Sequence, residues 1–216
     1  MGVIKQGILG GFRKKTGTVV GAYWRSLDVI RGLPRSSGKA ATEKQLSVQL
    51  KFGLVTPFLS RFAALINRGF ASSAGVSTPM NVAVSYHIKN AIVGIYPDYE
   101  IELTKVRFSE GSLELPVEFL VEPAAGGIVN ISWEYDVQLK DDRYMPSDSL
   151  SVLVYNPVKS KFMRASLVAE RSAGTYAMQL PNVFVGDTVH IYVAFSSTTT
   201  ANLNSDSTYI SELTVL

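Results

Sequence analysis

Residues 129–135 read VNISWEY, and apolar and polar side chains alternate strictly along them. A period of two places alternate side chains on opposite faces of a β-strand. One face of this strand carries the apolar members of the run: Val129, Ile131, Trp133 and Tyr135. The same period returns from Tyr99 to the C-terminus, between turn clusters such as residues 124–127 and 156–157. Roughly seven to nine short strands at this spacing predict an antiparallel β-sandwich.

Two features narrow the sandwich to the immunoglobulin-like class. Trp133 faces inward on its strand, as the core tryptophan of such domains does. Residues 186–192 are typical of the corner before a late strand, with Tyr192 or His190 near the corner. The chain contains no cysteine. The likeness is therefore to cysteine-free relatives such as fibronectin type III modules.

The N-terminal segment has a different pattern. Residues 1–34 are interrupted by glycines too often for a helix, and the β-rich runs 18–24 and 27–31 predict an arm that contains a hairpin. A capping-box sequence at residues 42–45 begins a helix that we expect to run to about Ile66. Pro57 predicts a kink or break in this helix near Val55–Thr56.

Two apolar rows run along this first helix, so we expect it to be buried on more than one side. The rows are Leu46, Leu50, Leu54 and Phe58, and Phe52, Val55, Leu59, Phe62 and Ile66. A second helix is expected from Thr78-Pro79 to about Val93, with Gly94 at its C-terminal cap.

The predicted fold class is therefore α+β with two parts. A basic N-terminal arm/hairpin plus two helices occupies residues 1–98. A C-terminal immunoglobulin-like (fibronectin III-like) antiparallel β-sandwich occupies residues 99–216.

Charge is divided unevenly along the chain. Residues 1–70 hold 12 Lys/Arg and two acidic residues, whereas residues 71–216 hold 9 Lys/Arg and 16 acidic residues. The halves carry about +10 and −7, which the net charge of +3 conceals. Such a chain is suited to contact between the basic half of one copy and the acidic half of another, or between the basic half and an anion such as nucleic acid.

Little in the sequence points to a reaction. Without cysteine, thiolate metal sites and cysteine nucleophiles are excluded. The glycine-rich segment matches neither phosphate-binding loop pattern, and the two histidines, His87 and His190, have no nearby partner in the sequence. The carboxylates follow the polar side of the strand alternation. We therefore expect no catalytic residues, metal, cofactor or small-molecule substrate, and we do not expect an enzyme.

The best candidate binding surface is a basic cluster with neighbouring aromatic residues. Positive side chains neutralise phosphates or carboxylates, and aromatic faces stack on bases. The candidate assembly or anion-contact residues are Arg13, Lys14, Lys15, Tyr23, Trp24, Arg25 and Arg31.

The opening residues 1–12, with residues 16–24 and 29–31, form a distinctive run that continues in Thr42-Glu43-Lys44-Gln45-Leu46 and Lys51-Phe52. This run resembles a family of uncharacterised proteins of about 210 residues from Bacteroidetes genomes. The resemblance implies a bacterial or phage-associated protein and carries over no catalytic residues.

Two functional hypotheses follow. The first is a non-enzymatic structural protein that self-assembles into a filament, tube or shell through its N-terminal arm and oppositely charged faces, with other copies of itself as partners. The alternative is a nucleic-acid-binding module that uses the basic N-terminal segment. No secretory signal or membrane-spanning stretch is recognisable, so we expect a cytoplasmic protein or a component of an assembled particle or virion.

Overall fold

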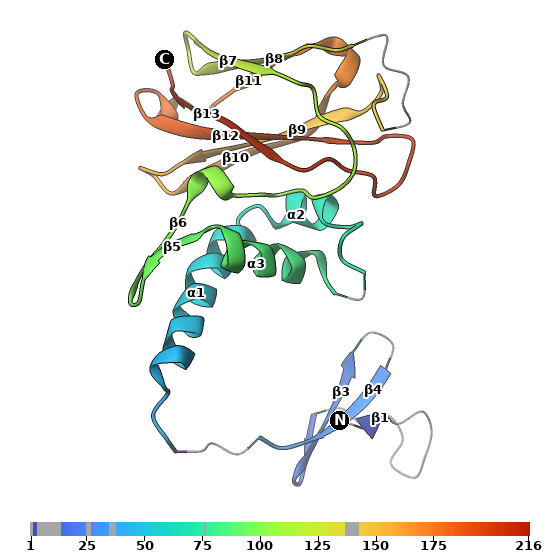
Figure 1. The fold of residues 1–216 in the computed structure, drawn as a ribbon, viewed down its shortest axis with the longest axis vertical. Coiled ribbons are helices and arrows are strands. Elements are labelled where there is room, and N and C mark those ends of the chain that lie inside the picture. Colours follow the sequence, from blue (N-terminus) through green and yellow to red (C-terminus); the bar gives the residue numbers. More distant parts are fainter. Residues whose placement is uncertain (1, 4–13, 25–26, 35–37, 76, 137–142) are drawn as a thin grey trace. The chain divides into compact units, whose positions relative to one another are not determined.

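The computed structural model describes residues 2–3, 14–24, 27–34, 38–75, 77–136 and 143–216 (Figure 1). The chain forms two compact units, Met1–Thr42 and Glu43–Leu216. The sequence pattern instead predicts a domain boundary after residue 98. The difference arises because the helical segment shares an apolar core with the following sheets and does not form a unit with the first 42 residues.

The N-terminal unit contains a four-stranded antiparallel sheet with the strand order β1-β4-β3-β2. Its strands are β1 (Gly2–Val3), β2 (Lys14–Thr16), β3 (Val19–Trp24) and β4 (Leu27–Gly32). The predicted hairpin is present as β3 and β4, which pair along their full length. Gly17, with φ of +59°, forms the tight turn between β2 and β3, and a glycine adopts this conformation without steric cost.

Three helices begin the second unit, the body: α1 (Glu43–Ser60), α2 (Ala63–Gly69) and α3 (Pro79–Asn90). The predicted break near Val55–Thr56 is wrong, because α1 continues through Pro57 and ends at Ser60. The Ser60 hydroxyl donates to the Pro57 carbonyl at 2.8 Å, where a continuing helix would place the Arg61 amide. The chain then tightens into a 3₁₀-type turn at Phe62 before α2 begins.

The start of α3 is as predicted, and its end is not. The Thr78 hydroxyl accepts from the Asn81 amide at 3.2 Å, and Pro79 takes the first helical position. The helix ends at Asn90, before the hairpin of β5 (Ile92–Ile95) and β6 (Asp98–Ile101). Gly94 therefore does not cap the helix. It lies in β5 with φ of +89°, where a Cβ would lie 2.2 Å from the Asp98 carbonyl oxygen.

Seven further strands form two antiparallel sheets, with strand orders β10-β9-β12-β13 and β11-β8-β7. The four-stranded sheet consists of β9 (Ser149–Asn156), β10 (Lys161–Glu170), β12 (Thr188–Ser196) and β13 (Thr208–Thr214). The three-stranded sheet consists of β7 (Phe119–Ala124), β8 (Ile128–Trp133) and β11 (Thr175–Gln179). Short 3₁₀ helices lie at Leu103–Lys105, Arg171–Ala173 and Asn182–Phe184. The predicted α+β class is confirmed.

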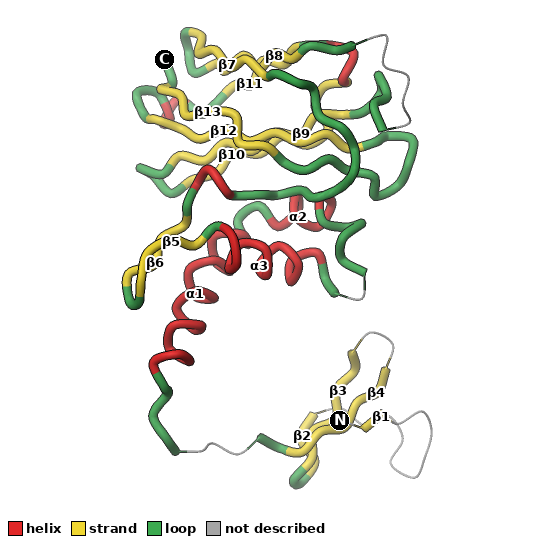
Figure 2. Tube along the Cα trace, in the orientation of Figure 1, coloured by secondary structure: helices red, strands yellow, loops and turns green. Residues whose placement is uncertain are grey.

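Each face of the four-stranded sheet covers a separate apolar core. Between the two sheets, Val152, Ile191 and Val193 pack against Ile131 and Trp133. On the opposite face, alternate residues of the same strands pack against α2, α3 and the C-terminal half of α1 (Figures 1 and 2). The buried members of this second core are Val55, Leu59, Phe62, Leu65, Ile66, Phe70, Ala83, Val84, Val106, Phe108, Leu153, Tyr192 and Ala194.

This second core explains why Tyr192 does not form the predicted corner. A tyrosine corner bonds to backbone only a few residues upstream. The Tyr192 hydroxyl instead donates to the Leu103 carbonyl at 2.7 Å, 89 residues away in the chain. His190 lies on the same face of β12, with its Nδ1 atom 3.2 Å from the Tyr209 hydroxyl.

Candidate functional site

The N-terminal sheet brings three of the predicted contact residues onto one face. Val20 on β3 pairs with Lys15 on β2 and with Arg31 on β4, so the two cations flank Val20 in one row across the strands. Trp24 lies on the same face, four residues further along β3, and is 53% exposed. This basic face therefore combines two positive charges with an exposed aromatic ring.

Two other predicted contact residues lie on the opposite side of the sheet. Lys14 pairs with Gly21 and Tyr23 pairs with Asp28, which places both side chains on the opposite side of the sheet. Arg13 and Arg25 lie outside the described residues. Neighbouring residues of a strand point to opposite faces, so residues that are adjacent in the sequence cluster lie on different sides of the sheet. Counting nearby cations in the sequence does not reveal this separation.

The outer face of the three-stranded sheet carries the opposite charge. Its outward positions include Glu122 on β7, with Glu118 and Glu134 continuing the alternation one residue beyond β7 and β8, and all three are exposed. A shallow hollow of about 310 Å³ lies between these strands, lined partly by Glu118, Leu120 and Glu134. Leu120 is 58% exposed. We call this surface the acidic face; it combines carboxylates with exposed apolar area.

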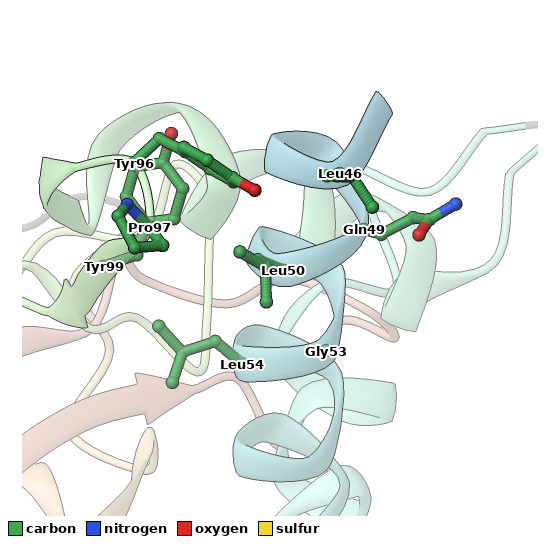
Figure 3. Close-up of a pocket in the computed structure, with 8 residues that line it drawn as sticks. All are labelled: Leu46, Gln49, Leu50, Gly53, Leu54, Tyr96, Pro97 and Tyr99. Atoms are coloured by element: carbon green, nitrogen blue, oxygen red, sulfur yellow. The ribbon is translucent and has the colours of Figure 1, made fainter. Parts of the chain in front are cut away.

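The N-terminal half of α1 forms a third open surface. Four large apolar side chains there are between one third and just over one half exposed: Leu46, Val48, Leu50 and Phe52. Leu46, Leu50 and Leu54 face Tyr96, Pro97 and Tyr99 of the β5–β6 hairpin across a groove of about 610 Å³ (Figure 3). Phe52 lines a second groove of about 420 Å³, together with Val84 and Ile88 of α3.

Polar contacts hold the hairpin beside α1. The hydroxyls of Ser47 and Tyr99 are 2.7 Å apart, and the Lys51 ammonium lies 4.7 Å from the centre of the Tyr99 ring. Gln49 points away from the hairpin (Figure 3). The first groove therefore has one wall fixed by these contacts and an open side that follows the helix.

Sequence reasoning missed this surface. The two apolar rows of α1 predict burial on more than one side, but that burial is reached only in the C-terminal half, at residues such as Val55 and Leu59. The two apolar rows of α1 are themselves the sequence signal for an apolar surface on this helix. What the sequence could not supply is how far the helix extends beyond the sheet on which it packs.

The buried titratable groups of the body have structural roles. His87 Nδ1 donates to the Ala83 carbonyl at 2.7 Å, and His87 Nε2 accepts from the Arg107 amide at 3.1 Å. Burial lowers the pKa of His87, and the nearby Arg107 charge lowers it further. Both ring nitrogens are engaged by backbone, so the neutral ring links α3 to residue 107.

Arg171 and Asp148 form an ion pair that is fully buried, with Arg171 Nη2 3.1 Å from the Asp148 carboxylate. The guanidinium lies between the rings of Tyr144 and Phe195, at 4.2 and 4.3 Å from their centres. Burial raises the pKa of Asp148 despite the Arg171 charge. The Arg171 backbone carbonyl also accepts from the Trp133 indole at 2.8 Å, so residue 171 contacts both Asp148 and a side chain of the inter-sheet core.

Across the described ranges, no group of three or more His, Asp or Glu residues is placed to hold a metal ion. None of the helices described there is both long and apolar enough to cross a bilayer. The arrangement described above is suited to binding through exposed faces: one basic, one acidic and one apolar.

A family model described as "Family of unknown function (DUF6266)" matches residues 11–211, and the chain belongs to that family. This confirms the resemblance to an uncharacterised family of about 210 residues. A search of curated proteins found no match.

Proposed function

We propose that this chain is a non-enzymatic structural protein that assembles with copies of itself into a filament, tube or shell. The basic face of the N-terminal sheet of one copy binds the acidic face of a neighbouring copy. Different surfaces meet in such a contact, so each copy added head to tail leaves one basic and one acidic face open, and the contact propagates into rings or open helices. A bacterial or phage-associated setting, which the resemblance implies, and a place in an assembled particle agree with this role.

One observation carries the proposal: the complementarity of the two faces. Lys15 and Arg31 flank Val20 in a row, and the acidic face presents Glu118, Glu122 and Glu134. Both faces also expose apolar area, at Trp24 and Leu120 respectively. Charge complementarity fixes orientation and speeds encounter, while apolar burial supplies affinity.

The strand order supports the finer part of the proposed fold, a fibronectin III-like sandwich. Counted from β7, the first, second and fifth strands form one sheet, and the third, fourth, sixth and seventh form the other. Trp133 lies on the second of these strands and packs edge-on against Phe195 in the inter-sheet core. Sandwich modules of this kind commonly serve as structural and binding units.

Charge exchange tests the contact. In full-length protein we expect a large assembly by light scattering at micromolar concentration, and monomers or small species for K15E/R31E and for E118K/E134K. Mixing the two variants should restore pairing between unlike copies. The matched control, R68E/K161E, makes the same charge change at exposed positions outside both faces and should assemble normally. A wild-type monomer, or assembly unaffected by K15E/R31E, would contradict the proposal.

Nucleic acid is the second candidate partner, favoured by Trp24 lying on the same face as Lys15 and Arg31. An exposed ring beside two cations can stack a base while the cations neutralise phosphates. A gel shift with single-stranded DNA and RNA at low salt tests this function, with W24A and Y23A as a matched pair on opposite faces. We expect W24A alone to weaken binding; the absence of any shift at low salt would remove this candidate.

A further inference from the structure

The N-terminal half of α1 exposes more apolar surface than a solvent-facing helix usually does. Val48 and Phe52 are 54% and 48% exposed, and Leu46 and Leu50 are 37% and 45% exposed. With 3.6 residues per turn, Leu46 and Leu50 follow one flank of the helix and Val48 and Phe52 follow the other. The grooves beside these flanks are open to receive further side chains.

The strip between the two flanks is uncharged. It consists of Gln45, Gln49, Gly53 and Thr56, which are all exposed. A Cβ built at Gly53 would meet no atom within 4 Å, so the backbone can be approached closely there. Packed helices lie about 8–10 Å apart, and the distance depends on the side chains at the contact.

We propose that α1 pairs with α1 of a second copy, antiparallel and about a two-fold axis. The partner helix lies along the uncharged strip, and its apolar flanks fill the two grooves. This contact is independent of the one between the basic and acidic faces.

The charges of α1 indicate both the occupant and its direction. The helix carries only Glu43, Lys44 and Lys51, and none of them lies on the strip. A strongly charged partner would find no counter-charge there, whereas a second uncharged strip is complementary. A parallel pair would align the two helix dipoles side by side, whereas an antiparallel pair opposes them, which is electrostatically favourable.

The two-fold contact has a different consequence from the contact between charged faces. A contact between identical surfaces is saturated by two copies and cannot propagate alone. Combined with a propagating contact, it joins two growing assemblies side by side. In K15E/R31E protein, the α1 contact alone should give a dimer.

Cysteine cross-linking tests the geometry, because the chain has no cysteine of its own. Single cysteines replace Gln45, Gln49 and Gly53 in full-length protein, in the K15E/R31E background. A disulfide requires Cα atoms about 4.4–6.8 Å apart. In an antiparallel pair only the position nearest the axis meets its own copy, since a shift of four residues along both helices separates the copies by about 12 Å. We therefore expect one strong cross-link among the three positions.

Each alternative gives a different result. Cross-links at all three positions would indicate a parallel pair, and cross-links at none would overturn the proposal. V158C, at a 72% exposed site of the body, is the control and should not cross-link. In the same background, L50E should raise the dimer Kd by about tenfold or more, because it places an unpaired charge in the interface. Circular dichroism confirms that L50E is folded, and an unchanged Kd in a folded variant would also overturn the proposal.

Discussion

The N-terminal sheet and the β10-β9-β12-β13 sheet are both four-stranded and antiparallel, but they differ in what covers their faces. In the described part of the N-terminal sheet, Val29 is the one buried apolar side chain. In the body, Val152 is buried on one face of β9 and Leu153 on the other, each with no exposed area. Each buried Val or Leu contributes about 1.5–3 kcal/mol. Equal strand number therefore does not imply equal stability, because the body sheet buries apolar side chains on both faces and the described part of the N-terminal sheet buries one.

The largest expected effect comes from breaking the buried ion pair of the body. Arg171→Ala leaves the Asp148 charge buried without its partner, and we expect it to lower the free energy of unfolding by about 3–5 kcal/mol. Urea denaturation followed by tryptophan fluorescence measures this change. Arg164→Ala, which removes an exposed arginine from β10, is the control and should change stability by less than about 0.5 kcal/mol. Equal effects in the two variants would show that Arg171 does not anchor the core.

The next effect tests the packing of the helices on the four-stranded sheet. A Cβ at Gly69 would lie 2.3 Å from the Phe108 carbonyl oxygen, so Gly69→Ala must displace backbone. We expect a loss of about 2–3 kcal/mol by urea denaturation. Gly53→Ala is the matched change in a helix, and in the dilute monomer, with no neighbour within 4 Å, it should stabilise slightly, by about 0.5 kcal/mol. A neutral Gly69→Ala would indicate that α2 is not held tightly against residue 108.

The difference between these two glycines illustrates what the sequence can predict. Local signals are sufficient for the Thr78 cap, for the β3–β4 hairpin and for the alternation that produces the strands of the two antiparallel sheets of the body. They are not sufficient where distant segments meet. Helix α1 continues through Pro57 while Val55 and Leu59 pack in the core that it shares with the sheet, and the Tyr192 hydroxyl bonds to the Leu103 carbonyl, 89 residues away.

The candidate site divides in the same way. The basic cluster is evident from residue types, but its separation into two faces depends on register, since Lys15 and Arg31 align through Val20 while Tyr23 pairs with Asp28. The outward direction of the acidic positions follows from alternation alone. Which half of α1 is exposed depends on how far the four-stranded sheet and the other helices extend beneath it. No local sequence pattern encodes that length.

A smaller effect concerns pH and again belongs to the body. The folded state lowers the pKa of His87, mainly through burial, so the unfolded chain binds a proton more readily near its ordinary value of 6.5. Above pH 6.5 the His87 ring is neutral in both states, and the free energy of unfolding is unaffected by it. As the pH falls below that value, the unfolded chain takes up a proton that folded His87 resists, and the free energy of unfolding decreases. We expect thermal unfolding to show a falling Tm from pH 8 to 5.5. His87→Gln should start from a lower Tm at pH 8 and show a flatter profile, and an unchanged slope would exclude His87 as the titrating group.

The smallest expected effect on the body comes from removing the N-terminal unit altogether. Residues 43–216 contain both apolar cores, so a chain that begins at Glu43 should unfold with a Tm within about 2 °C of the full-length protein under dilute, monomeric conditions. The peptide of residues 1–42 should show no cooperative transition, because a small sheet with one buried apolar side chain among its described residues cannot offset its conformational entropy. Calorimetry of both fragments measures this asymmetry. Cooperative unfolding of the isolated peptide would show that the N-terminal sheet is stable without a partner. The difference in stability between the two four-stranded sheets would then reflect their size and not a need for contact with another surface.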